Sequence, residues 1–193
     1  MKYLILVTTL FFTITTYAQI NSEGALKSFV NKCVMALSKQ DSVAVNKLLN
    51  PAVGFYLIHN NGAFNAYYAT NVISFNFNYP LTLLKNTLGL KNMPLKKGSL
   101  PTYSCDTEKW NKLGAFYTPT TPAFTLSNIC EMRNKYVPDN IPQSTINSFK
   151  TLEKNSRLIY IINKSKSLIM LVTFVNNKWY LTAVDDATGD CSA

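Results

Sequence analysis

Residues 157–186 read RLIYIINKSKSLIMLVTFVNNKWYLTAVDD and carry a strong strand pattern. They contain three apolar segments, at 157–163, 167–175 and 178–184, which are rich in β-branched and aromatic residues and predict three consecutive strands. Only Asn176 and Asn177 separate the second segment from the third, and a two-residue connection of this kind favours a tight antiparallel hairpin. We therefore expect residues 157–184 to form an antiparallel meander.

Further strands are expected earlier in the chain. Residues 53–59, VGFYLIH, are aromatic and branched, and the turn-forming NNG at 60–62 follows them. Residues 72–79, VISFNFNY, alternate apolar with polar side chains, which predicts a half-buried antiparallel strand. Residues 64–71, FNAYYATN, lie between these two strands and are interpreted as one or two helical turns. A short strand is expected within 100–106, LPTYSCD.

Two helices are expected at the start of the chain and two in its middle. Residues 22–38 place apolar side chains on one helical face. Asp41 is the predicted N-cap of a second, short helix, which Pro51 ends. The two helices of the middle region are expected at 125–137 and 143–155.

Helices that are separated along the chain from antiparallel strands predict an α+β fold, here as one domain over residues 19–193. We expect the N-terminal helices to pack on a curved antiparallel sheet, with a helical and loop region inserted in the middle. A doubly wound sheet would need a glycine-rich turn between a strand and a helix. The seven glycines are scattered, so we predict neither a nucleotide-binding turn nor a phosphate loop, and no cofactor.

The first residues have the pattern of a secretory signal peptide. Lys2 precedes an apolar stretch over 3–12, and the small residues Thr16 and Ala18 form a cleavage site. The stretch is too short for a membrane span, which needs roughly 20 apolar residues. We interpret residues 1–18 as a signal peptide and expect a periplasmic or extracellular protein with no transmembrane segment.

Four cysteines follow the signal peptide, and an even number in an exported chain predicts two disulfide bonds. None of them has the spacing of a zinc site or a redox-active pair, so we predict no metal site. Three connectivities are possible. We favour a bond between Cys105 and Cys191, which would hold the end of the last strand against the middle region. Cys33 would then pair with Cys130.

Two segments carry a resemblance to a known superfamily. They are FVNKCVMALSKQDSVAVNKLL at 29–49, followed by a strand, and the closing hairpin FVNNKWYLTAVD at 174–185. Both resemble the nuclear-transport-factor-like, or ketosteroid-isomerase-like, superfamily of cystatin-like α+β domains, and in particular its exported bacterial members. The resemblance implies a cone-like domain, in which a curved sheet wraps around the first helix and leaves a pocket at its open end. Some members use an Asp or His base there, whereas others bind ligands or dimerise; no catalytic residue of a member matches a position here.

Four tyrosines are the candidate ligand-binding residues. Tyr56, Tyr67, Tyr68 and Tyr103 would line an apolar pocket and orient a ligand through their hydroxyl groups, because a buried hydroxyl needs a partner. Packing in the core is the alternative for the aromatic residues. The sequence therefore favours an exported, non-catalytic domain that binds a small apolar molecule or a partner protein.

His59 and Asp106 are the candidate catalytic residues of the alternative, a pocket enzyme of the isomerase, dehydratase or hydrolase type. His59 is the only histidine, so a Ser–His–Asp or Cys–His site would require it. It is in phase with Phe55 and Leu57 and would act as a general base at the mouth of the pocket. A position on the surface rim is the other interpretation of His59.

The charged residues bear on three kinds of partner: a bound cation, an anionic surface and nucleic acid. Asp185, Asp186 and Asp190 follow the last strand, but their spacing fits no calcium loop, and a solvated turn is favoured over a cation site. The net charge of +9 falls by one with the signal peptide, and it allows contact with an anionic surface. Arg133 and Arg157 are the only arginines of the mature chain, whereas phosphate recognition favours Arg, so no nucleic-acid partner is expected.

Overall fold

The computed structural model describes residues 23–75, 93–118, 125–137, 139–164, 167–189 and 191. The expected signal peptide and Asp190 lie outside these residues. The helices are α2 (Glu23–Lys39), α3 (Ser42–Asn46), α4 (Leu126–Tyr136) and α5 (Gln143–Lys154). The strands are β1 (Phe55–Asn61), β2 (Phe64–Thr70), β3 (Leu95–Lys97), β4 (Tyr103–Ser104), β5 (Lys109–Trp110), β6 (Gly114–Thr118), β7 (Ser156–Ile162), β8 (Ser167–Val175) and β9 (Lys178–Asp185).

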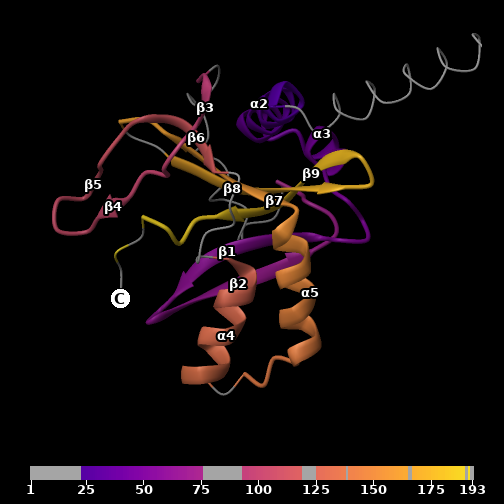
Figure 1. The fold of residues 1–193 in the computed structure, drawn as a ribbon, viewed down its shortest axis with the longest axis vertical. Helices are drawn as coiled ribbons and strands as arrows, with labels where there is room; N and C mark the ends of the chain where they lie inside the picture. The colour runs from indigo at the N-terminus through magenta and orange to yellow at the C-terminus, as the bar shows by residue number, and fades with distance from the viewer. Residues whose placement is uncertain are drawn as a thin grey trace, which may run out of the picture.

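Seven of the strands form one sheet in the order β2-β1-β9-β8-β7-β6-β3, while β4 and β5 form a separate pair (Figure 1). The pairs β1–β9 and β3–β6 are parallel and the other pairs are antiparallel. The predicted α+β fold, with its four helices and its closing meander of three strands, is therefore confirmed.

Two tight turns set the register of the two hairpins that they close, β8–β9 and β1–β2. Asn176 and Asn177 have φ angles of 48° and 62°, and left-handed conformations at both central residues are the turn geometry that matches the twist of paired strands. Gly62, with a φ of 71°, begins the turn between β1 and β2. That turn makes Phe64–Thr70 the antiparallel partner of the whole of β1. The prediction of helical turns for 64–71 is therefore wrong.

The strand predicted for 72–79 is also wrong over its first half, and Asn76–Tyr79 lie outside the described residues. The Asn46 side chain donates to the carbonyl oxygen of Ile73 at 2.9 Å and accepts from its backbone N–H at 2.7 Å. The Ser42 hydroxyl accepts from the backbone N–H of Phe75 at 3.2 Å. Because α3 side chains satisfy these backbone groups, residues 72–75 are held against α3 rather than in a ladder.

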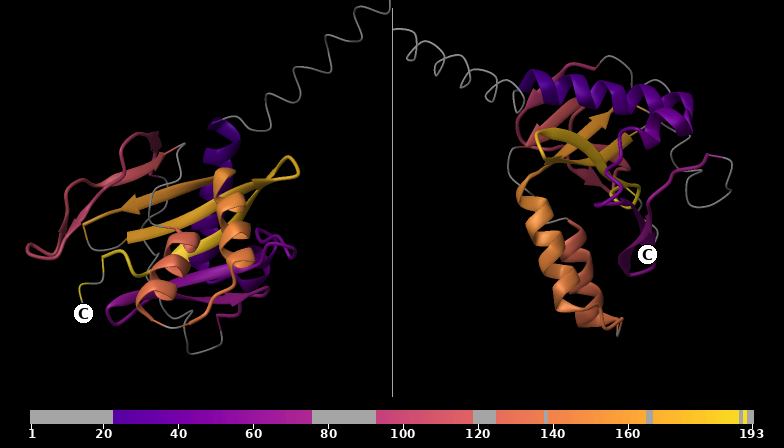
Figure 2. Two further views of the ribbon diagram at one scale, coloured as in Figure 1. Left: turned by 60° about the horizontal axis from the view of Figure 1, so that its bottom comes forward. Right: turned by 90° about the vertical axis from the view of Figure 1, so that its right-hand side faces the viewer.

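Helices cover both faces of the sheet. α2 lies on one face, and α4 and α5 lie side by side on the other (Figure 2). Neighbouring side chains of a strand point to opposite faces, so Ile159 and Ile161 of β7 pack with α2, whereas Leu158 and Ile162 pack with α4 and α5. The middle region of the chain thus supplies the second covering layer of the sheet.

The position of the cysteines relative to the sheet explains which of them are bonded. The predicted bond between Cys105 and Cys191 is confirmed. The predicted bond between Cys33 and Cys130 is wrong, because both are free, buried thiols. Cys33 of α2 and Cys130 of α4 belong to apolar clusters on opposite faces of the sheet, so the sheet separates their sulfur atoms.

This arrangement predicts the outcome of a thiol titration without reductant. The native protein should react slowly with a thiol reagent, because Cys33 and Cys130 are fully buried and burial raises the pKa of both thiols, which lowers the thiolate fraction that reacts. After denaturation, two thiols should react in each chain. A result of zero would show that a second disulfide forms.

Candidate functional site

The structure brings two of the four candidate tyrosines together. The rings of Tyr56 and Tyr67 meet edge to face with centroids 5.6 Å apart, and each also meets the ring of Phe149 on α5 edge to face. Tyr68, next to Tyr67 on β2, points to the opposite face of the sheet and is half exposed. Tyr103 lies in the separate β4–β5 pair.

The Tyr56 and Tyr67 pair is packed against the thiol of Cys130. The Cys130 Sγ is 3.8 Å from the Tyr67 hydroxyl, and the Tyr56 hydroxyl donates to the Val53 carbonyl oxygen at 3.0 Å. Burial raises the pKa of both phenols, and the neighbouring Cys130 raises them further. These hydroxyls therefore stay protonated at physiological pH; the Tyr56 hydroxyl donates to a backbone carbonyl, whereas the Tyr67 hydroxyl accepts from the Cys130 thiol.

The two catalytic candidates come from different parts of the fold. His59 lies in β1 opposite Ala66 and is partly buried. Asp106 is exposed in the turn between β4 and β5, next to the disulfide. Among the described residues, no group of three or more His, Cys, Asp or Glu side chains is placed to hold a metal ion.

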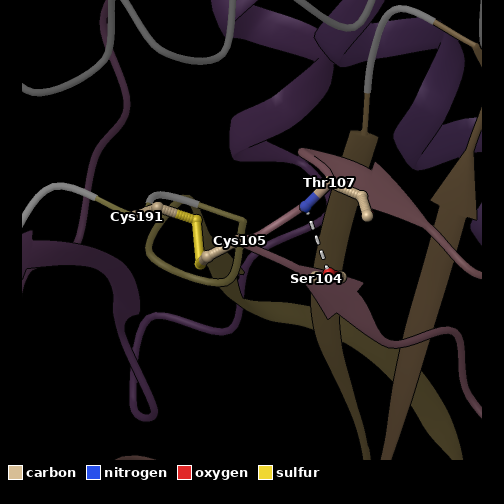
Figure 3. The surroundings of a disulfide bond; sticks show 4 residues. All are labelled: Ser104, Cys105, Thr107 and Cys191. Atoms are coloured by element: carbon tan, nitrogen blue, oxygen red, sulfur yellow. Dashed lines mark hydrogen bonds between the residues drawn. A yellow bond between two sulfur atoms is a disulfide. The ribbon is translucent and has the colours of Figure 1, made fainter.

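The disulfide joins the segment after β9 to the β4–β5 pair (Figure 3). Both of its cysteines are exposed. Next to it, Gly189 faces Trp110 and Tyr103, and the Trp110 ring meets the Tyr103 and Tyr160 rings at centroid distances of 5.2 and 5.8 Å. The bond thus holds the β4–β5 pair and the last described residues around one aromatic cluster.

Asp185 organises the turn that leads to this disulfide. Its carboxylate accepts from the backbone N–H groups of Ala187 and Thr188 at 2.8 and 3.0 Å, and from the Thr188 hydroxyl at 2.7 Å. Burial raises the pKa of Asp185, against the opposing effect of these donors. Burial, with the nearby Asp185 charge, also raises the pKa of Tyr160 to about 12. The Asp185 side chain therefore forms the turn locally, through residues 187 and 188.

We expect this buried carboxylate to make stability depend on pH. A carboxyl group whose pKa is higher in the folded state keeps its proton longer there, so the free energy of unfolding falls as pH rises from the ordinary pKa of 3.8 to the raised value. In Asp185→Asn this contribution should be lost, so the stability of the variant relative to wild type should increase with pH across that window. Urea unfolding measured at several pH values tests this.

If Asp185→Asn and wild type keep a constant difference in unfolding free energy from pH 3 to 7, the carboxyl group of Asp185 does not titrate differently in the two states.

An open groove of about 490 Å³ runs along α5 beside the end of β8. Its polar lining consists of uncharged amide and hydroxyl side chains: Asn147, Ser148, Thr151, Asn155 and Thr173. Its apolar lining consists of three aliphatic side chains: Val53, Leu152 and Val175. The groove contains none of the candidate tyrosines, His59 or Asp106.

A chain of buried, hydrogen-bonded hydroxyl groups lies next to the groove. The Thr182 hydroxyl donates to that of Thr173 at 2.7 Å, the Thr173 and Ser156 hydroxyls are 2.7 Å apart, and Ser156 donates to the carbonyl oxygen of Leu152 at 2.9 Å. Each hydroxyl has one proton, so Thr173 must donate to Ser156. The chain ties the end of α5 to three neighbouring strands and fixes the position of both walls of the groove.

The groove was not predicted from the sequence, although one signal of it is visible there. Asn147, Thr151 and Asn155 are spaced four residues apart, which places them in one line along a helix. Ser148 and Leu152 also lie on α5, whereas Val53 precedes β1 and the remaining two groove residues, Thr173 and Val175, lie on β8. No local pattern could have joined these three residues to α5.

Comparison with known proteins gives no relative from which a site could be transferred. No protein-family model matches the chain, and neither a curated protein nor a solved structure is significantly similar to it. In the part of the chain that the structure describes, no helix is long and apolar enough to cross a membrane.

Proposed function

We propose that this protein is an exported binding domain whose ligand occupies the groove along α5. The observation that carries the proposal is the lining of the groove, in which five amide or hydroxyl side chains stand beside three aliphatic ones. A few polar groups that orient a ligand beside apolar surface are typical of binding sites. The lining residues include no acid, base or thiol, so they supply hydrogen bonds rather than proton transfer or nucleophilic attack.

Export is supported by the disulfide. An exposed disulfide such as Cys105–Cys191 persists in oxidising compartments, whereas cytosolic reductants remove it. The proposal does not depend on the resemblance to the nuclear-transport-factor-like superfamily, which stays a prediction. The binding role of the four tyrosines, the catalytic roles of His59 and Asp106, and contact with an anionic surface also stay predictions.

The proposal can be tested by locating bound fragments with NMR. A library of small neutral compounds is titrated into ¹⁵N-labelled protein, and we expect the largest shifts at the backbone amides of Asn147, Ser148 and Thr151. The variant Ser148→Phe fills the groove from an exposed helix position and should remove these shifts while leaving the unfolding temperature close to that of wild type. Shifts that gather around Tyr67 and Phe149 instead would contradict the proposal and favour the aromatic pocket.

A further inference from the structure

We propose that the groove binds an extended, uncharged peptide segment through its backbone. This inference rests on the proposed function and specifies its ligand class. Asn147 and Thr151 on α5 and Asn155 at its C-cap form a line of hydrogen-bonding side chains in the lining, which we call the α5 ladder. Three features of the groove favour a peptide: the spacing of the ladder, the direction of its hydrogen bonds and the lack of charge in the lining.

The spacing of the α5 ladder is close to that of a peptide strand. Residues four apart on a helix are separated by about 6 Å along its axis. Along one edge of an extended peptide, the backbone groups of every second residue recur at about 6.7 Å. Over the two steps of the ladder the mismatch grows to only about 1.4 Å, which flexible Asn side chains accommodate.

The hydrogen bonds that the ladder already makes determine what it offers a ligand. The Asn147 Oδ1 accepts from the Gln143 side chain at 3.1 Å, so its Nδ2 group remains to donate. The Thr151 hydroxyl donates to the Asn147 carbonyl oxygen at 2.9 Å, so it accepts from a ligand. The Asn155 amide carries both functions, and its backbone carbonyl oxygen accepts from Phe174 of β8 at 2.9 Å, which fixes its position. A donor and an acceptor at successive steps suit the C=O and N–H groups of a peptide backbone.

The remaining lining residues agree with this occupant. Val53, Leu152 and Val175 give the groove an apolar wall that would contact alternate side chains of the segment, because side chains of an extended peptide alternate in direction. No charged side chain lines the groove, so a charged segment would lose hydration without gaining a partner. The lining also has no aromatic ring on which a sugar ring would stack.

The test uses ¹⁵N-labelled full-length mature protein and a blocked hexapeptide of alternating valine and serine. The side-chain NH₂ signals of Asn147 and Asn155 should shift on titration. Binding should weaken about thirtyfold in the double variant Asn147→Ala/Asn155→Ala, as the loss of two ordinary hydrogen bonds predicts. Asn31→Ala, an exposed substitution on α2 at the opposite face of the sheet, is the matched control and should bind as wild type does.

A second peptide separates backbone recognition from nonspecific contact. The same hexapeptide with N-methyl groups on alternate residues keeps its side chains but loses half of its N–H donors, and it should bind at least tenfold more weakly. Equal binding of the two peptides, or no binding of either, would overturn the inference. If maltohexaose, a neutral oligosaccharide, shifts the ladder signals and the peptides do not, the groove remains a binding site and only the peptide assignment fails. If none of these probes or the fragments shifts a groove signal, the proposed function fails as well.

Discussion

Replacing Cys105 and Cys191 by serine is expected to lower the free energy of unfolding by about 4 kcal/mol, because the bond closes a loop of 86 residues and thereby restricts the unfolded chain. For a protein of this size the unfolding temperature should fall by roughly 10 °C. Adding a dithiol reductant to the wild type should produce the same change. Thermal and urea unfolding, monitored by circular dichroism, measure both effects.

The loss should also be visible locally in hydrogen exchange. Each strand of the β4–β5 pair has two residues, and an isolated hairpin of this size is not stable in water. Its attachment comes from the disulfide and from the packing of Trp110 against Tyr160. Exchange should therefore become faster over 99–112 and 186–191 than in the rest of the sheet.

The double serine variant supplies the control for the reductant. It should unfold at the same temperature with and without dithiol, because Cys33 and Cys130 are already thiols. If the wild type is equally insensitive to the reductant, the disulfide does not form or does not limit the unfolded chain.

The parts of the fold that could be predicted from the sequence are those set by local pattern. The closing meander follows from its continuous apolar segments and from the Asn176-Asn177 turn, and Asp41 caps α3 as expected by accepting from the Ala44 N–H at 2.9 Å. The errors arose where tertiary contacts replaced local preference. The Asn46 side chain forms hydrogen bonds with the backbone N–H and carbonyl oxygen of Ile73. The alternating segment around Ile73 therefore does not form the strand that its pattern favours.

The sequence of β7 indicates that helices cover both faces of the sheet, but this second layer was not predicted. Six of the seven residues of β7 are buried, and a strand that is apolar on both sides indicates that both faces of its sheet are covered. In the structure that second layer is formed by α4 and α5 opposite α2, which places Cys130 on the other face of the sheet from Cys33. The groove itself depends on how α5 sits beside β8, which is a tertiary contact that no local pattern encodes.

Glu153 makes the contact between α4 and α5 that we expect to matter most for the second layer. Its side chain is 4% exposed and accepts from the backbone N–H of Ser127 at 2.9 Å and from the Ser127 hydroxyl at 2.6 Å. Ser127 lies in the first turn of α4, where backbone N–H groups have no partner within the helix. A carboxylate from α5 therefore caps α4, in a place where water does not reach.

Removal of the Glu153 carboxylate should lower the free energy of unfolding. Glu153→Ala leaves two buried donors of Ser127 without this acceptor, and the free energy of unfolding should fall by about 3 kcal/mol. Glu153→Gln keeps the size and one acceptor oxygen but places an NH₂ group near a donor, so an intermediate loss of about 1.5 kcal/mol is expected. Urea unfolding with a common m-value gives both numbers.

The chain offers a matched control in a second glutamate that joins the same two helices. Glu131 of α4 forms an ion pair with Lys150 of α5 at 2.6 Å, with both side chains nearly half exposed. Because water and salt screen such a pair, Glu131→Ala should lower the free energy of unfolding by less than about 1 kcal/mol. Equal losses for Glu131→Ala and Glu153→Ala would mean that burial of the Glu153 contact adds nothing, and the α4 cap would then not be what holds the two helices on the sheet.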